Sequence, residues 1–139
     1  MLIKNIYLLV ICLTWVQLAQ AQSTSFQWGK QIGGDSSTAH KFIDFKTDLF
    51  GNTYSLGYFS GTVDLDPGPA TYHLSASGNF GFYILKLNAS GNFAWAKSIS
   101  NSDIAIANSL CVDGFGNVYT TGYFTTVTDF DPSNGKYVL

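Results

Sequence analysis

Apolar and polar residues alternate in short runs along most of the chain after residue 25, and turns that contain glycine separate these runs. Alternation with a period of two places one set of side chains on each face of a β-strand. It predicts seven strands and a short extra one, near residues 26–32, 41–47, 52–59, 80–87, 93–99, 105–112, 117–124 and 72–74. The pattern therefore indicates an all-β chain.

Three turns between these runs share one sequence pattern, with Asp or Asn first, Gly fourth and Asn fifth. They are Asp48–Asn52, Asn88–Asn92 and Asp113–Asn117, and Ser75–Asn79 is a looser fourth copy. A polar acceptor at the first position suits a type I turn, and the glycine can take the positive φ of the bulge that follows. We therefore expect short loops that join antiparallel strands.

Part of the chain repeats itself at a constant offset. Residues 48–74 align with residues 113–139, and thirteen of these 27 positions are identical. A second match, at an offset two positions longer, sets residues 26–32 on residues 93–99 at every second position. A repeat of this length built from strands indicates propeller blades or stacked sheet modules.

The repeated motif also resembles a known family. The pattern Asp-x-x-Gly-Asn-x-Tyr-x-x-Gly-Tyr, at Asp48–Tyr58 and Asp113–Tyr123, resembles the seven-bladed β-propeller repeat type of large secreted bacterial proteins. Residues Phe82–Asn88 and Trp95–Lys97 are similar to that repeat as well. The resemblance extends over residues 26–139 and implies antiparallel four-stranded blades arranged radially, together with export from the cell.

The resemblance also assigns the strands to blades. It implies one blade at residues 41–99 and a partial blade at residues 105–139, with strand 26–32 as an outer strand that closes the ring. Propellers hold 4–8 blades, whereas these residues hold fewer than two repeats. We therefore expect an incomplete ring and a fragment of a longer protein, whose partners are the remaining blades.

Composition excludes several classes of protein. The chain has 7 lysines and no arginine, 9 aspartates and no glutamate, and only 12% charged residues. Good helix formers for solvent-facing positions are scarce, which excludes a helix bundle. Positive charge is too sparse to neutralise phosphates, so we expect no nucleic-acid partner. The apolar content of 46% argues against a disordered chain.

Two aspartate pairs are the most distinctive polar residues: Asp64 with Asp66, and Asp129 with Asp131. In an extended segment, residues i and i+2 point to the same side, so each pair could share a calcium ion. Calcium takes 6–8 oxygen ligands, however, and no EF-hand loop follows. The alternative is a structural loop in which the aspartates accept backbone amide hydrogens before a proline turn. We favour the loop because it recurs in both repeats.

No catalytic constellation stands out, and we expect no enzyme activity. His40 and His73 fall outside the repeat pattern, and we expect His73 to be an exposed strand residue. Cys111 is expected to be a small buried hydrophobic residue. No metal-binding histidine pair, paired cysteines or nucleophile elbow occurs in the sequence. We expect no cofactor, with calcium as the open alternative.

Aromatic residues are expected to pack between blades. Trp28 and Trp95 could offer faces to sugar rings, but large side chains at strand spacing are the normal filling of sheet interfaces. Tyr58-Phe59 and Tyr123-Phe124 each place one ring on each face of a strand. We therefore expect at least one ring of each pair in the core.

Three classes of function fit the sequence. The favoured one is a noncatalytic extracellular propeller that acts as a scaffold or binds an extracellular protein or glycan. The second is part of a carbohydrate-active enzyme whose catalytic residues lie outside this chain. The third is a surface module stabilised by calcium.

Residues 1–21 have the parts of a secretory signal peptide. Lys4 supplies positive charge, residues 6–18 are mostly apolar, and Ala19-Gln20-Ala21 has the small-x-small pattern of a cleavage site. This apolar run is shorter than a membrane helix, which needs about 20 residues. We therefore expect a secreted or surface protein with no stable membrane span after cleavage.

The predicted signal peptide implies cleavage after Ala21, which makes Gln22 the first residue of the mature chain. N-terminal sequencing of protein recovered outside the cytoplasm checks this expectation. A mature chain that retains Met1 contradicts it.

Overall fold

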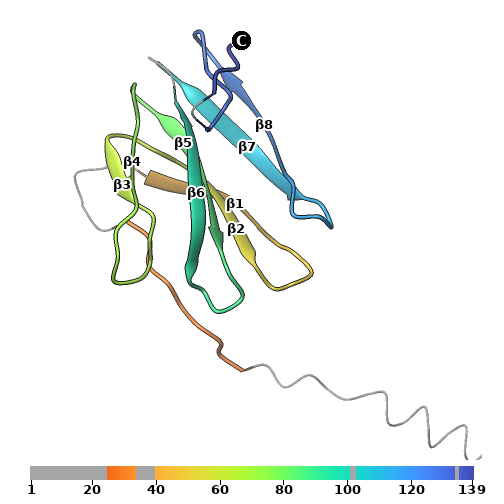
Figure 1. Cartoon of the computed structure of the whole chain (residues 1–139). Helices are drawn as coiled ribbons and strands as arrows, with labels where there is room; N and C mark the ends of the chain where they lie inside the picture. The colour runs from red at the N-terminus through yellow and green to blue at the C-terminus, as the bar shows by residue number, and fades with distance from the viewer. Residues whose placement is uncertain (1–24, 34–39, 101–102, 134) are drawn as a thin grey trace, which may run out of the picture.

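The computed structural model of the chain describes residues 25–33, 40–100, 103–133 and 135–139 (Figure 1). The predicted signal peptide lies outside the described residues. The strands are β1 (His40–Thr47), β2 (Thr53–Phe59), β3 (Thr62–Asp64), β4 (His73–Ser75), β5 (Gly81–Leu87), β6 (Phe93–Ser100), β7 (Ala105–Val112) and β8 (Val118–Phe124). The predicted all-β class is confirmed.

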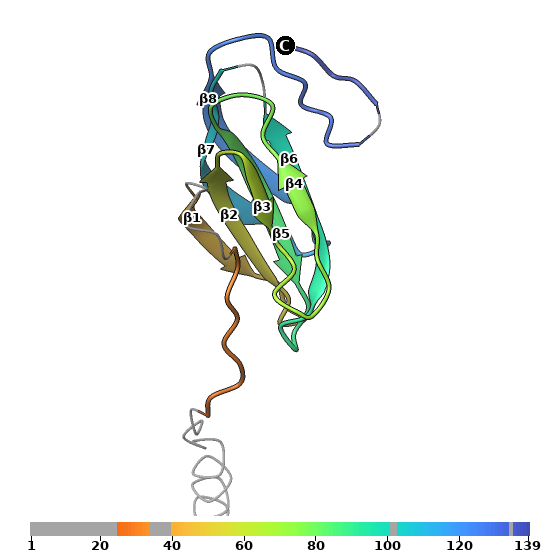
Figure 2. The same cartoon turned by 90° about the vertical axis from the view of Figure 1, so that its left-hand side faces the viewer.

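The longest strands form one antiparallel sheet in the order β1-β2-β5-β6. This is the four-stranded sheet that the sequence predicts. Two smaller sheets, β3-β4 and β7-β8, complete the described structure, and the described residues do not close into a ring. We call β1–β6 the first module and the chain from β7 onward the second module. The small sheets lie on opposite faces of the four-stranded sheet and give three layers (Figures 1 and 2).

The three close copies of the turn pattern form hairpins as predicted. Gly51, Gly91 and Gly116 have φ values of 80°, 75° and 82°. Each glycine donates its backbone N–H to the carbonyl of the first turn residue at 2.8–3.2 Å. The looser fourth copy, Ser75–Asn79, is different because it connects β4 to β5, which belong to different sheets. It is therefore a crossing between layers and not a hairpin.

The repeat in the sequence is also a repeat in the structure. Phe42 of β1 pairs with Gly57 of β2, and at the equivalent place in the second module Ala107 of β7 pairs with Gly122 of β8. Each pairing is followed by an irregularity in the first strand of the module, β1 or β7, so both modules carry a β-bulge at the same place. Strands β7 and β8 are thus a second copy of β1 and β2.

One face of the four-stranded sheet is covered by the chain around it. Phe59 and Leu85 lie at the centre of a buried cluster on this face, together with Val63 and Leu65 at the end of β3. Partly buried side chains of residues 28–32 pack against the same cluster. The small β3-β4 sheet and the N-terminal segment therefore form the cover.

The other face of the sheet packs against the second module. Tyr54 and Leu56 of β2 are fully buried there, in one cluster with Ala105, Ala107 and Leu110 of β7. The small alanine side chains let the backbone of β7 approach the large side chains of β2. Apolar burial between the sheets therefore joins the two modules.

A carboxylate at the bulge of β1 also joins the modules. Asp44 Oδ2 accepts a hydrogen bond from the backbone N–H of Leu110 at 2.9 Å and from the Ser109 hydroxyl at 3.2 Å. Its other oxygen, Oδ1, lies 2.6 Å from Lys46 Nζ. The hydrogen bond from Lys46, followed by that from Leu110, holds the pKa of the Asp44 carboxyl well below its usual range. The charged form of Asp44 is therefore the one that fits this position.

The predicted strand at residues 26–32 is not formed. Residues 25–33 have no strand pairing, although Trp28 and Ile32 pack on the first module. A strand needs a neighbouring edge for its backbone groups, and these residues lie against a sheet face instead. The short strand β3 was not predicted, whereas the short strand predicted at residues 72–74 is observed as β4.

Two predictions of burial in the second module are wrong. Tyr123 and Phe124 are both exposed, and Cys111 is exposed as well. Cys111 pairs with Tyr119 on the face of β7-β8 that points away from the first module. Burial at these positions requires a neighbour on that face or beside β8, and no strand of the described residues lies there.

Tyr54 and Tyr119 occupy equivalent positions in the two modules. They therefore isolate how much burial of this tyrosine contributes to stability. Both hydroxyls donate to the aspartate of the preceding turn at 3.2 Å, but Tyr54 is 0% exposed and Tyr119 is 57% exposed. We expect Tyr54→Ala to lower the free energy of unfolding by about 3–5 kcal/mol. We expect Tyr119→Ala to change it by at most about 1 kcal/mol. Urea denaturation at dilute protein concentration measures both, and equal losses contradict the assignment.

Candidate functional site

The first aspartate pair shapes the loop that leaves β3. Asp64 Oδ1 accepts hydrogen bonds from the backbone N–H groups of Asp66 at 3.0 Å and Tyr72 at 2.9 Å. Asp66 Oδ1 accepts one from the backbone N–H of Gly68 at 2.7 Å. Both carboxylates therefore bond to the backbone of their own loop, which is the geometry of Asx turns.

The second pair repeats this arrangement in the second module. Asp129 Oδ1 accepts hydrogen bonds from the backbone N–H groups of Asp131 at 3.1 Å and Tyr137 at 2.8 Å. Asp131 Oδ1 accepts one from the backbone N–H of Ser133 at 2.8 Å. The equivalent aspartates therefore have equivalent backbone partners in the two modules.

Hydrogen bonds lower the pKa of two of these carboxyls, one in each pair. The backbone N–H of Tyr72 is the main cause that lowers the pKa of Asp64, with further contributions from Asp66 and His73. The Ser133 side chain and backbone lower the pKa of Asp131. Within the described ranges, no group of three or more His, Cys, Asp or Glu side chains could hold a metal ion. The structure thus brings the aspartates together in pairs only.

Trp28 and Trp95 both pack against the protein. The indole N–H of Trp28 donates to the Ala89 carbonyl at 3.1 Å, and its ring lies so close to Gly91 that a Cβ there would be 2.7 Å away. Trp95 belongs to the cluster between the modules and meets the Tyr54 ring edge-on at 6.2 Å. The expectation that both rings contribute to packing is confirmed.

The histidines lie at the surface. His40 begins β1 and His73 begins β4, and both are exposed, as expected for His73. In the part of the chain that the structure describes, no helix is long and apolar enough to cross a bilayer.

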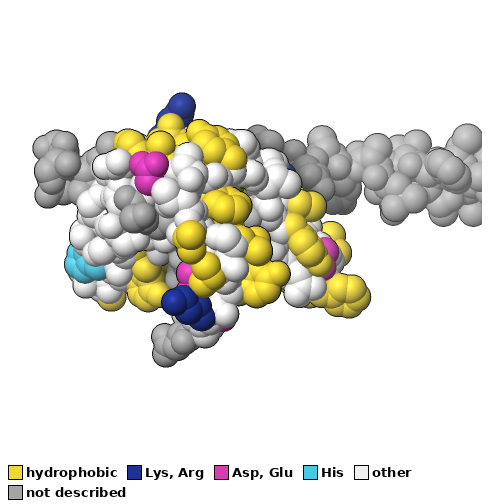
Figure 3. Space-filling model, turned by 90° about the horizontal axis from the view of Figure 1, so that it is seen from above, with side chains coloured by type: hydrophobic (Ala, Val, Ile, Leu, Met, Phe, Trp, Pro, Cys, Tyr) yellow, Lys and Arg dark blue, Asp and Glu magenta, His cyan; other side chains and the backbone are white. Residues whose placement is uncertain are grey.

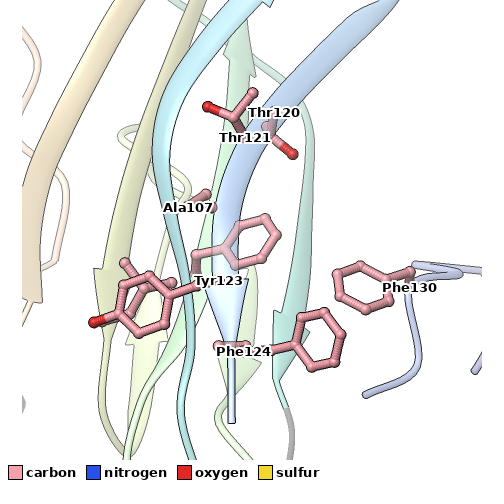
Figure 4. A pocket seen from close by; sticks show the side chains of 10 residues that line it. Ala107, Thr120, Thr121, Tyr123, Phe124 and Phe130 are labelled. Carbon is pink, nitrogen blue, oxygen red and sulfur yellow. The ribbon is translucent and has the colours of Figure 1, made fainter. Parts of the chain in front are cut away.

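A pocket of about 230 Å³ lies beside β8 and was not predicted from the sequence. Its walls are mostly apolar and come from both modules: Phe82, Ala105, Ile106, Ala107, Thr120, Thr121, Gly122, Tyr123, Phe124 and Phe130. Figure 4 shows the rings of Phe124 and Phe130 side by side at its rim, and their centroids are 5.1 Å apart. The repeated Gly-Tyr-Phe at residues 122–124 is the sequence signal that marks this place.

The surface around the modules carries few charges. Figure 3 shows apolar side chains in several patches on one face of the molecule, with isolated charged side chains among them. The exposed large apolar residues of β8 and its turn are Phe115, Tyr119, Tyr123 and Phe124.

Comparison with known proteins gives one partial similarity. Over 67 residues, which are 48% of this chain, the sequence is 34% identical to a WD repeat-containing protein of Acanthamoeba polyphaga mimivirus. The chain spans only 5% of the length of that protein. No family model and no solved structure matches the chain. The similarity supports a β-propeller repeat, and it does not extend to the secreted bacterial family that the motif resembles.

We expect the aspartate loops to bind calcium weakly, because their carboxylates already accept backbone amide hydrogens. Calorimetric titration of the mature chain with calcium should show no binding tighter than about millimolar, the weak end of natural calcium modules. Micromolar binding that disappears in the double variant Asp64→Ala, Asp66→Ala contradicts this expectation. Asp113→Ala, at an aspartate in a hairpin turn, is the control for a general loss of negative charge.

Proposed function

We propose that this chain is a noncatalytic β-propeller scaffold or binding module that stacks with further repeats of the same type. The observation that carries the proposal is the stacking face of β2, on which the second module packs. Tyr54, Leu56 and Tyr58 all belong to the cluster between the modules. The same positions of β8 carry Tyr119, Thr121 and Tyr123, and all three are exposed.

A further module can therefore pack on the exposed face of β8 in the way that the second module packs on β2. The two tyrosines of this face can pack against small side chains such as those at Ala105 and Ala107 of β7. A large aromatic side chain contributes strongly to an interface of this kind once the facing surface excludes water. The partial similarity to a WD repeat-containing protein agrees with such an arrangement.

The absence of a catalytic role is part of the proposal. The aspartates that the sequence singles out bond to the backbone of their own loops, and the pocket beside β8 is lined by apolar, threonine and tyrosine side chains. This arrangement favours a structural role for the aspartates over a role in acid–base catalysis. The alternatives, a carbohydrate-active enzyme with catalytic residues elsewhere and a calcium-stabilised module, have no comparable support in the described residues.

We also propose that the module acts outside the cell or at its surface. The predicted signal peptide at residues 1–21 supports this location. The partners would then be further blades of the same protein, with an extracellular protein or glycan as the target of the assembled propeller.

The open stacking face predicts that the mature chain, residues 22–139, self-associates. Sedimentation velocity should show species larger than a monomer at micromolar concentration, because an extended apolar surface is costly to leave in water. The double variant Tyr119→Ser, Tyr123→Ser should shift the chain toward a monomer. The control variant Leu49→Ser, Phe50→Ser removes exposed apolar side chains from a turn and should not. A sharp monomer peak with cooperative thermal unfolding for the unchanged chain contradicts the proposal.

A further inference from the structure

The pocket beside β8 has a filled counterpart in the first module. Because β7-β8 repeats β1-β2 in register, Gly122, Phe124 and Phe130 correspond to Gly57, Phe59 and Leu65. Gly122, Phe124 and Phe130 line the pocket. Phe59 and Leu65 are fully buried in the first module. Comparison of the two modules therefore shows what is missing from the second one.

The side chain that fills this space in the first module is Tyr83 of β5. Tyr83 pairs with Gly57, and a Cβ on Gly57 would lie 2.6 Å from its ring. The rings of Tyr83 and Phe59 have centroids 6.1 Å apart, and both belong to one cluster with Leu65. The glycine leaves room for the tyrosine, and the phenylalanine and leucine hold its ring.

The second module has the walls of this site, and the described residues do not fill it. Strand β8 pairs only with β7 among the described strands, so its other edge offers unpaired backbone groups. Gly122 again lacks a side chain, and a Cβ there would meet the Ile106 carbonyl across the bulge, as a Cβ on Gly57 would meet the Lys41 carbonyl. The volume of about 230 Å³ exceeds the apolar cavity of about 150 Å³ that accepts benzene in another protein.

We infer that the pocket and the free edge of β8 form a docking site for one antiparallel strand of a further repeat segment, which inserts a tyrosine side chain over Gly122. The register of the first module assigns the contacts. The incoming tyrosine lies opposite Gly122, a phenylalanine opposite Tyr123, and a glycine opposite Phe124, as Tyr83, Phe82 and Gly81 do on β2.

This site is distinct from the stacking face of β8, although it rests on the proposed function. The stacking face is covered by a neighbouring sheet, whereas the edge takes a strand within the same sheet. Backbone hydrogen bonds along the edge supply affinity that any strand can use. The pocket supplies the selectivity, because a large side chain at this position, such as the tyrosine of the first module, is needed to fill the space above Gly122.

A peptide with the sequence of residues 75–100 tests the site, because it carries β5, its hairpin turn and β6. It is added to the dilute mature chain, and amide hydrogen exchange is measured along the chain. We expect protection over residues 118–124 of β8. The peptide variant Tyr83→Ala should bind about 10-fold more weakly or worse, and Tyr83→Phe should bind about as well as the unchanged peptide.

The peptide variant Ile84→Ala is the matched control. It shortens an apolar side chain on the opposite face of the same strand, so its affinity should change by less than about threefold. Equal binding of the unchanged and Tyr83→Ala peptides overturns the inference, as does protection that falls outside β8. Protection of β8 in the self-associated chain that the peptide cannot displace also overturns it, because a second copy is then the occupant.

The two proposals fail in different ways. A chain that self-associates through Tyr119 and Tyr123 but does not bind the peptide keeps the stacking proposal and loses the docking site. A monomeric chain that unfolds cooperatively and shows β8 already protected loses both.

Discussion

The packing of β7 on β2 is the interaction on which the rest of the structure depends. Without it the four-stranded sheet would expose Tyr54 and Leu56, and β7-β8 would be an isolated hairpin, which is marginal in water. Ala105 and Ala107 keep the two sheets close, and the charged Asp44 carboxylate bonds to the backbone of β7 at the side of the contact. This one interface therefore stabilises both modules and determines how the second module packs on the first.

A local irregularity has a wider effect on the sheet. The bulge in the first strand of each module, β1 or β7, brings backbone atoms close to the partner strand, and a glycine lies opposite, at Gly57 or Gly122. Because glycine has no side chain, it leaves space on the same face of the sheet. In the first module Tyr83 fills that space and extends the core, and in the second module it is the pocket. The bulge, the glycine and the pocket are thus parts of one arrangement.

The aspartates show how an acidic pair can organise a loop in each repeat. Asp64 and Asp129 each accept two hydrogen bonds from backbone N–H groups, and these bonds organise the loop. A metal ion would have to compete for the same carboxylate oxygens. The function that we propose lies in surfaces that pack and strands that pair. It is the kind of function that repetition favours, because each module supplies the same face to the next.

The strands, the hairpin turns and the register of the repeat were determined by the sequence. All the predicted strands except 26–32 lie within one residue of their observed bounds, because alternation and Asp-x-x-Gly turns act through near neighbours. The tertiary structure alone decided which repeated positions are buried. Phe59 is 0% exposed and Phe124, in the same motif, is 42% exposed. Burial depends on what packs against a residue, and identical motifs have different neighbours. For the same reason, only the tertiary structure showed that residues 26–32 form no strand, that Cys111 is exposed and that a pocket opens beside Gly122.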